Sequence, residues 1–274
     1  IATQLGLSLG DIVLTEAGFG ADLGAEKFFN IKCRFGGLNP EAAVIVATVR
    51  ALKMHGGVKK DALGKPDVEA LKRGMVNLEA HVKNVQKFGV PAIVALNRFT
   101  SDSDDEIRTV LDAAKGWGAR AALSEVWAKG GEGGEAVAKE ILATLDEKKG
   151  KFQPLYDAAL PIKDKIGIIA REIYGADGVD YTSAAEKNIA QLEAMGLGKT
   201  PVCIAKTQYS FSDDASKLGR PTGFRITIRD AYPSAGAGFV VAMAGEIMTM
   251  PGLSKTPSAE AIRVHPDGTI EGLF

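Results

Sequence analysis

Three segments, two of them rich in glycine, place aromatic and charged side chains directly after predicted strands. The first, TEAGFGADLGAEKFFNIKCR, runs from Thr15 to Arg34. Its glycines allow a ligand to approach the backbone closely, and the N-terminus of the following helix offers unpaired N–H groups. Core packing accounts for Phe28 and Phe29, but Phe19 lies between two glycines and suits a turn that covers a ligand. The residue types favour a binding turn and a structural turn about equally.

The second segment, VALNRFTSDSDDE, contains Asn97 at the end of a predicted buried strand. In doubly wound folds this edge of the sheet is where nucleotides bind, and an amide can donate to and accept from a ring edge at once. The structural alternatives are a cap for Asn97 and a solvated helix N-terminus for Asp102–Glu106. Ligand binding is favoured for Asn97, whereas both interpretations stay open for the acidic run.

The third segment, SEVWAKGGEGGE, spans Ser124 to Glu135. Trp127 lies in a turn between a predicted strand and four glycines, where few core partners are available. A tryptophan in such a place suits stacking on a flat ligand, worth roughly 0.5–1.5 kcal/mol beyond area burial. Lys129 is placed to neutralise an anion beside it. Trp117, at a helix end, is predicted to be an ordinary packing residue.

Two further glycine motifs are not predicted to bind phosphate. GLGKT (Gly196–Thr200) ends like a P-loop, but the first glycine of that motif would fall at Glu193. GLGKT also follows a helix and precedes a strand, the reverse of a P-loop, so it predicts a helix C-cap and turn. SAGAGF (Ser234–Phe239) is an incomplete dinucleotide fingerprint between two strands and predicts a tight turn.

The composition is that of an ordinary globular protein: 274 residues, 46% hydrophobic and 24% charged, with a net charge of -1. This length suffices for two or three cores, and the charge gives no overall attraction to nucleic acid or to a membrane. No apolar run is long enough to span a membrane, and no signal peptide is recognised. Cys33 and Cys203 are predicted to be reduced thiols, as in the cytoplasm. The histidines show no metal-ligand or Ser/His/Asp pattern.

Strands and helices alternate through the first half of the chain. Strands are predicted at Asp11–Thr15, Val90–Leu96 and Arg120–Ser124. Residues 40–52 fit both a strand and a helix, and AAVIVATV within them favours a fully buried strand. Residues 67–88 form an amphipathic pattern, and Ser103 with Glu106 predicts a capping box for the next helix, which ends near Gly116. Another helix follows the third segment, to about Lys148. This order indicates a parallel, doubly wound α/β sheet.

The pattern changes after Pro161. Helices are predicted at 162–174 and 183–195, on either side of the turn-rich sequence GADGVD. Strands are predicted at 202–205, 224–229 and 239–248. With boundaries near residues 78 and 176, the expected domains are 1–78, 79–176 and 177–274.

Several long motifs together resemble one enzyme family. They run in order through nearly the whole chain: TEAGFGADLGAEKFFNIKCR, EVWAKGGEGG, LPIKDKIGIIAREIYGADGVDY, CIAKTQYSFSDD, RPTGFRITIRD and MTMPGL. The sequence is similar to formate–tetrahydrofolate ligase. The resemblance implies an ATP-dependent reaction through formyl phosphate that yields 10-formyltetrahydrofolate, ADP and phosphate. It also implies Mg²⁺, a monovalent cation (K⁺ or NH₄⁺), a homotetramer in the cytoplasm, and small molecules as the only partners, without nucleic acid or membrane.

The resemblance also implies roles for individual residues. Phe99 and Trp127 match the aromatics that sandwich the pterin ring, and Phe19 matches a third pocket residue. Glu16 is expected to touch a metal ion or its water shell. The residues expected near the nucleotide or the pterin, without a division between the two, are Asn97, Ser124, Gly130, Gly131 and Gly133.

The family's phosphate-binding loop and formyl-phosphate arginine have no counterpart in this sequence. The catalytic residues are therefore expected elsewhere, and the chain is predicted to be a C-terminal portion that is inactive alone. The implied fold is the end of a P-loop NTPase-like parallel sheet domain followed by two smaller α/β domains. Alternatives are a non-catalytic folate- or purine-binding fragment, one chain of a split enzyme, or the ligase domain of a larger folate enzyme.

Overall fold

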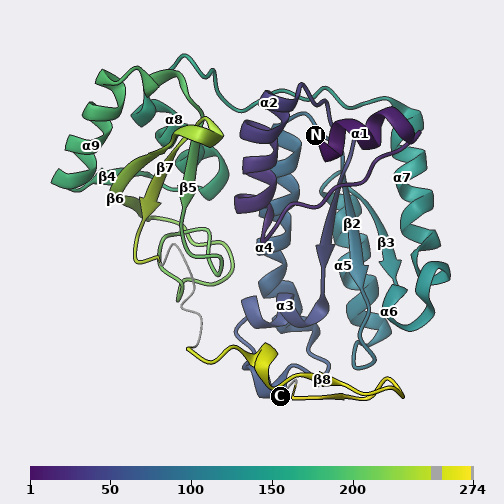
Figure 1. Cartoon of the computed structure of the whole chain (residues 1–274). Coiled ribbons are helices and arrows are strands. Elements are labelled where there is room, and N and C mark those ends of the chain that lie inside the picture. Colours follow the sequence, from purple (N-terminus) through teal and green to yellow (C-terminus); the bar gives the residue numbers. More distant parts are fainter. Residues whose placement is uncertain (248–254, 273–274) are drawn as a thin grey trace.

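The computed structural model describes residues 1–247 and 255–272, which form two α/β lobes and a small C-terminal hairpin (Figure 1). The motif MTMPGL and the end of the strand predicted at 239–248 lie outside these residues. The first lobe (residues 1–148) contains α1 (Ala2–Leu9), α2 (Arg34–Gly36), β1 (Ala43–Ala47), α3 (Val49–His55), α4 (Val68–Lys87), β2 (Ala92–Asn97), α5 (Asp104–Gly116), β3 (Arg120–Ser124), α6 (Val126–Lys129) and α7 (Glu135–Glu147). The second lobe (residues 162–247) contains α8 (Ile162–Ile169), β4 (Gly178–Tyr181), α9 (Ser183–Ala194), β5 (Val202–Ala205), β6 (Arg225–Ser234) and β7 (Phe239–Ala244). The hairpin pairs β8 (Arg263–Val264) with β9 (Ile270–Glu271).

The first lobe is built on a parallel sheet of order β1-β2-β3. Central β2 is buried along nearly its whole length because strands flank it on both sides, and α4, α5 and α7 pack on the sheet. An uncharged strand is what this environment requires. The predicted α/β class with parallel strands is therefore confirmed.

The local predictions in this lobe hold where the sequence pattern is strong. Helix α4 is capped by Asp67, whose carboxylate accepts the backbone N–H of Ala70 at 2.8 Å. The predicted capping box is present at the start of α5, with Ser103 and Glu106 bonded to each other's backbone. Strand β3 has the predicted bounds. These elements follow from caps and periodicity within their own segments.

Strand β1 differs from its prediction. It forms, but one face is open: Val44 is exposed and Val46 is 63% exposed. The segment Asp11–Thr15, predicted as a strand, has no strand partner in the described part of the chain. In the described sheet β1 is consequently an edge strand, and it is separately open on the face that carries Val44 and Val46.

The second lobe contains a mixed sheet of order β4-β6-β7-β5. β6 and β7 are antiparallel around the short turn Ala235–Ala237, which confirms a tight turn in SAGAGF. GLGKT likewise forms the predicted cap and turn, with Gly196 in the left-handed conformation after α9. Strand β4 was not predicted, because GADGVD is turn-like in sequence and becomes a strand only by pairing with β6.

The predicted domain boundaries need correction. Residue 78 lies inside the continuous helix α4, and the strands before and after that helix, β1 and β2, pair in one sheet. A boundary at residue 176 would separate α8 from β4 and β5, although α8 contacts both strands. The connection between the lobes is instead the segment 149–161, which lacks helix and strand and runs across the top of the molecule in Figure 1.

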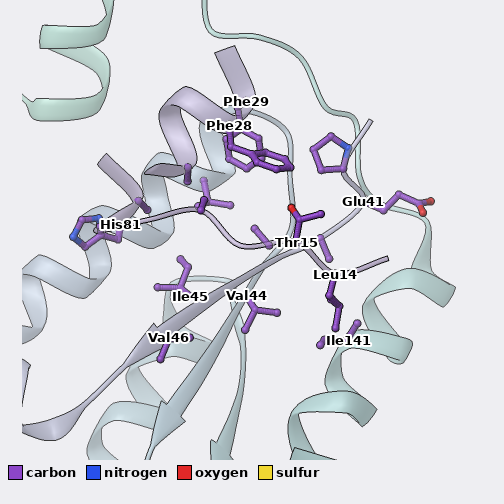
Figure 2. Close-up of a pocket in the computed structure, with 18 of the residues that line it drawn as sticks. Leu14, Thr15, Phe28, Phe29, Glu41, Val44, Ile45, Val46, His81 and Ile141 are labelled. Atoms are coloured by element: carbon purple, nitrogen blue, oxygen red, sulfur yellow. The ribbon is translucent and has the colours of Figure 1, made fainter. Parts of the chain in front are cut away.

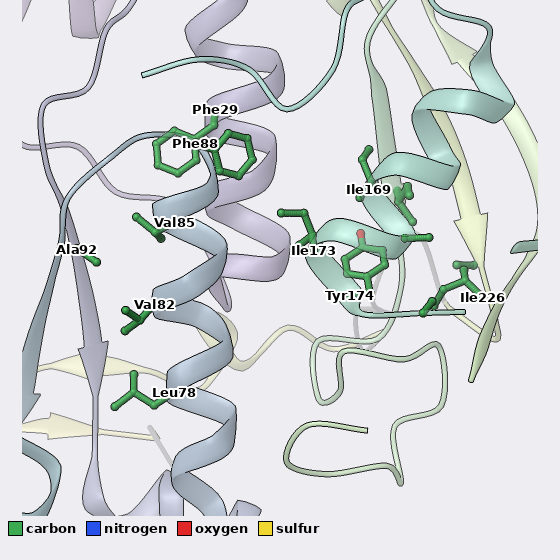
Figure 3. Packing of buried hydrophobic residues seen from close by; sticks show 14 of the residues in the cluster. Phe29, Leu78, Val82, Val85, Phe88, Ala92, Ile169, Ile173, Tyr174 and Ile226 are labelled. Atoms are coloured by element: carbon green, nitrogen blue, oxygen red, sulfur yellow. The ribbon is translucent and has the colours of Figure 1, made fainter. Parts of the chain in front are cut away.

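The two lobes share one hydrophobic core. Val85 and Phe88 of α4 belong to the same buried cluster as Ile173 and Tyr174 of the second lobe (Figure 3). The Asn84 side chain donates to the Ile173 carbonyl at 2.7 Å within this contact. Burial of this apolar surface fixes the second lobe against α4.

Candidate functional site

The loops that follow β2 and β3 are joined at the carboxyl edge of the first sheet. Asn97 lies opposite Ser124 in the strand register, and the Arg98 N–H donates to the Ser124 carbonyl at 3.0 Å. The Arg98 guanidinium also lies 3.3 Å from the Glu125 carboxylate. These contacts hold the segment carrying Phe99 beside the segment carrying Trp127. In parallel α/β sheets this edge is where ligands bind.

Phe99 is held by its own loop and by α3. Its backbone N–H donates to Asp102 at 2.8 Å, and the Arg50 guanidinium lies 4.7 Å from the ring centre. The ring is still 40% exposed. Burial raises the pKa of Asp102, although the Phe99 N–H opposes that effect. One face of Phe99 thus has a cation partner while much of the ring remains accessible.

The acidic run after Phe99 divides into exposed and buried residues. Asp104 and Asp105 are solvated at the start of α5, but Asp102 and Glu106 are buried. The Glu106 carboxylate lies 2.9 Å from the Lys53 ammonium, and neither side chain is exposed. The run is therefore partly a helix N-terminus and partly an internal support for the loop.

Trp127 is the most exposed aromatic of the two loops, at 86%. It lies on the short helix α6, whereas Trp117 packs partly buried against the core, as predicted. The Lys129 ammonium lies 2.7 Å from the Glu125 carboxylate, and this hydrogen bond lowers the pKa of Glu125. Lys129 is thus paired with Glu125 while half of its side chain stays exposed, and its contact with a bound anion stays a prediction.

The glycines after Trp127 have different reasons to be glycine. A Cβ on Gly133 would lie 2.4 Å from the Glu125 carbonyl carbon, so close backbone packing excludes a side chain. Gly130 has φ +59°, a conformation that favours glycine. Gly131 faces open space. Chain packing explains Gly133 and backbone conformation explains Gly130, while the space beside both Gly130 and Gly131 is open to a ligand.

Phe19 occupies a different place. It has a left-handed backbone (φ 61°), is 79% exposed, and lines a cavity of about 660 Å³ beneath the N-terminal segment. Neither Phe99 nor Trp127 lines this cavity, and the described residues show no ring contact between Phe19 and either aromatic. The structure thus places Phe99 and Trp127 on two joined loops, without a ring contact between them among the described residues, and places Phe19 at a separate cavity.

The cavity beside Phe19 is mainly aliphatic. Figure 2 shows Leu14 and the exposed face of β1 on one side, with Phe28 and Phe29 above. His81 of α4 lies at one end. The open face of β1 therefore contributes directly to this hollow.

Glu16 does not form a metal site by itself. It is exposed and lines a smaller hollow of about 320 Å³ together with Lys27 and Cys203. Across residues 1–247 and 255–272, no group of three or more His, Cys, Asp or Glu residues is placed to hold a metal ion. Mg²⁺ is commonly held by one or two carboxylates together with substrate phosphates and water, so the contact expected of Glu16 stays a prediction.

Three residues beside the Phe19 turn were not predicted from the sequence. His81 adjoins Gly20, and the Lys206 ammonium of the second lobe lies 2.9 Å from the Asp22 carboxylate. Burial lowers the pKa of His81. These residues lie far apart in the chain, so no spacing rule could have grouped them.

Among the described helices, none is both long enough and apolar enough to cross a membrane. The fold and the site define an α/β protein with a candidate ligand-binding edge formed by two joined loops. The family model of formate–tetrahydrofolate ligase matches residues 1–274, and the chain belongs to this family. Family membership makes it a ligase, whose substrates in this family are formate, tetrahydrofolate and ATP.

Proposed function

We propose that the chain supplies the pterin-binding edge for ATP-dependent ligation of formate to tetrahydrofolate through formyl phosphate. The observation that carries this proposal is the pair of exposed aromatics, Phe99 and Trp127, on loops held together by the contacts of Arg98. Exposed aromatic rings at a sheet edge gain free energy by stacking on a flat ligand. Asn97, Ser124 and Gly131 line the same edge, and we assign them to the pterin or the adenine.

The reaction has two steps. A formate oxygen attacks the γ-phosphorus of ATP, and the bond between that phosphorus and ADP breaks. The N10 electron pair of tetrahydrofolate then attacks the formyl carbon, phosphate leaves, and the nitrogen loses its proton. In this scheme Phe99 and Trp127 orient the pterin, and positioning of this kind is a major part of catalysis by transfer enzymes. Phe19 is assigned as a third contact to the folate or formyl phosphate.

The chain by itself is proposed to lack ligase activity. The sequence contains no complete P-loop, and GLGKT forms a helix cap and turn. Without such a loop the γ-phosphate has no cradle of backbone N–H groups and lysine. The three-stranded sheet is proposed to be the end of a P-loop NTPase-like sheet. Mg²⁺, a monovalent cation and the cytoplasmic homotetramer are proposed from the family resemblance alone.

The test is a fluorescence titration of the 274-residue chain with tetrahydrofolate. Saturable quenching is expected in the wild type and in Trp117→Phe, which retains Trp127. The response should disappear in Trp127→Phe, where Trp117 remains as the reference fluorophore. Equal quenching in both variants, or none in the wild type, would exclude Trp127 as a pterin contact.

A separate assay addresses the inactivity of the chain alone. The purified chain is incubated with formate, ATP and tetrahydrofolate, and 10-formyltetrahydrofolate is measured. No ATP-dependent product is expected. Formation of product would show that this chain holds the phosphates without a P-loop.

A further inference from the structure

Lys206 joins three parts of the molecule at the contact between the lobes. It follows β5, and its side chain is fully buried. Its ammonium lies 2.9 Å from Asp22 of the first lobe and donates to the carbonyls of Thr207, at 3.0 Å, and Ser210. It also lies 5.0 Å from the ring centre of Tyr174. A buried ammonium with this many partners holds them in one arrangement.

The Asp22 carboxylate in turn supports the Phe19 turn. A Cβ on Gly20 would lie 2.6 Å from Asp22 Oδ1 and 3.1 Å from His81 Cε1, so both side chains lie directly against the Gly20 backbone. The Gly20 carbonyl accepts the N–H groups of residues 23 and 24 at 3.0 and 2.9 Å. Phe19 itself has a left-handed backbone, which a non-glycine residue keeps only where its surroundings hold it.

The loop after Lys206 reaches across to the first lobe beside this turn. Phe211 stacks on His81 with ring centres 4.6 Å apart. At the loop's end, the Gly219 N–H donates to His55 Nδ1 at 3.0 Å, and the Asn77 side chain donates to the Gly219 carbonyl at 2.9 Å. Residues 206–219 therefore dock on α3 and α4, and they include most of the CIAKTQYSFSDD motif.

We propose that Lys206 and Asp22 are positioning residues, through which the second lobe holds the Phe19 turn in its binding conformation. This inference rests on the proposed role of Phe19 in the tetrahydrofolate pocket. Lys206 fixes Asp22, Asp22 and His81 fix Gly20, and Gly20 fixes the direction of the exposed Phe19 ring. The second lobe would then contribute to ligand binding without touching the ligand.

The test compares Lys206→Met with Lys163→Met. Lys163 is a matched control because it also pairs with a carboxylate, Glu186, and lies 5.0 Å from a tyrosine ring, but it lies on the outer surface of the same lobe. Tetrahydrofolate binding is measured by Trp127 fluorescence. Lys206→Met should weaken binding at least fivefold, and Lys163→Met less than twofold. Asp22→Asn/Lys206→Met removes both charges and is the variant to use if Lys206→Met fails to fold.

A double-mutant cycle separates positioning from general destabilisation. Phe19→Ala should weaken binding in the wild-type background and have no further effect beside Lys206→Met. Equal losses in both backgrounds would overturn the proposal. Hydrogen exchange provides a readout without ligand: the amides of residues 23 and 24 should exchange at least tenfold faster in Lys206→Met and stay unchanged in Lys163→Met.

The outcomes distinguish the two proposals. If the wild type does not bind tetrahydrofolate, the proposed function fails, and hydrogen exchange still decides whether Lys206 holds the turn. If the wild type binds but Lys206→Met binds equally well, the function stands and the positioning role is wrong. Unchanged exchange in a folded Lys206→Met would also refute that role.

Discussion

Removing the charge of Glu106 should destabilise the chain severely. Its carboxylate is fully buried, lies 2.9 Å from the Lys53 ammonium, and accepts the backbone N–H groups of Asp67 and Ser103 at 2.9 and 3.0 Å. Glu106→Gln would leave the buried Lys53 ammonium without its counter-charge. Breaking a buried pair in this way costs roughly 3–5 kcal/mol of unfolding free energy.

The pH dependence of stability gives a second value for the contribution of Glu106 to the free energy of unfolding. Burial alone would raise the pKa of Glu106, but the N–H groups of Ser103 and Asp67 and the Lys53 ammonium lower it from 4.5 to about 2. A carboxyl with a lowered folded-state pKa contributes stability that is complete above pH 4.5 and is lost as the pH falls to 2. At ~1.4 kcal/mol per pKa unit this contribution is about 3 kcal/mol.

Urea unfolding followed by circular dichroism measures both effects. The free energy of unfolding of Glu106→Gln should be about 3–5 kcal/mol lower than that of the wild type at pH 7. The variant should also lack the part of the wild-type loss of stability between pH 4.5 and 2 that this carboxyl causes. Lys53→Met/Glu106→Gln should recover part of the loss because no unpaired charge remains. Glu69→Gln is the control, since the Lys72–Glu69 pair is exposed, and should cost under about 0.5 kcal/mol. A Glu106→Gln loss below about 1 kcal/mol would refute the reasoning.

Two further predictions concern glycine packing and a buried lysine. Gly133→Ala should lower the free energy of unfolding by about 1–3 kcal/mol, because its Cβ would lie 2.4 Å from a carbonyl carbon. Gly131→Ala, with nothing within 4 Å, should change it by less than about 0.5 kcal/mol; equal effects in thermal melts would contradict the packing argument. Burial lowers the pKa of Lys165 to about 8, although its ammonium donates to three backbone carbonyls. Above pH 8 the unfolded chain binds more protons at this lysine than the folded chain does, so the free energy of unfolding of the wild type, relative to Lys165→Met, should rise between pH 8 and 10.5. Urea titrations across this range measure it, and a fall in this difference would contradict the prediction.

Local patterns were sufficient for the elements with strong internal signals. The apolar periodicity of α4, the Ser103–Glu106 capping box and the uncharged β2 are each visible within one short segment of the sequence. The long family motifs likewise identified the class of enzyme without coordinates. Trp127 was selected because an aromatic beside glycines lacks core partners in sequence, whereas Phe99 was named only through the family resemblance; both side chains are exposed.

The sequence by itself determined the helices α4, α5, α7, α8 and α9, the buried central strand and the family of this protein, because those follow from short-range periodicity and from residue order. Only the tertiary structure showed that β1 is a sheet edge, that β4 exists, and that the lobes divide at residues 149–161. It also decided that Asp22 meets Lys206. Strand neighbours and buried ion pairs join residues distant in the chain, so they depend on how the whole chain packs and leave no local pattern.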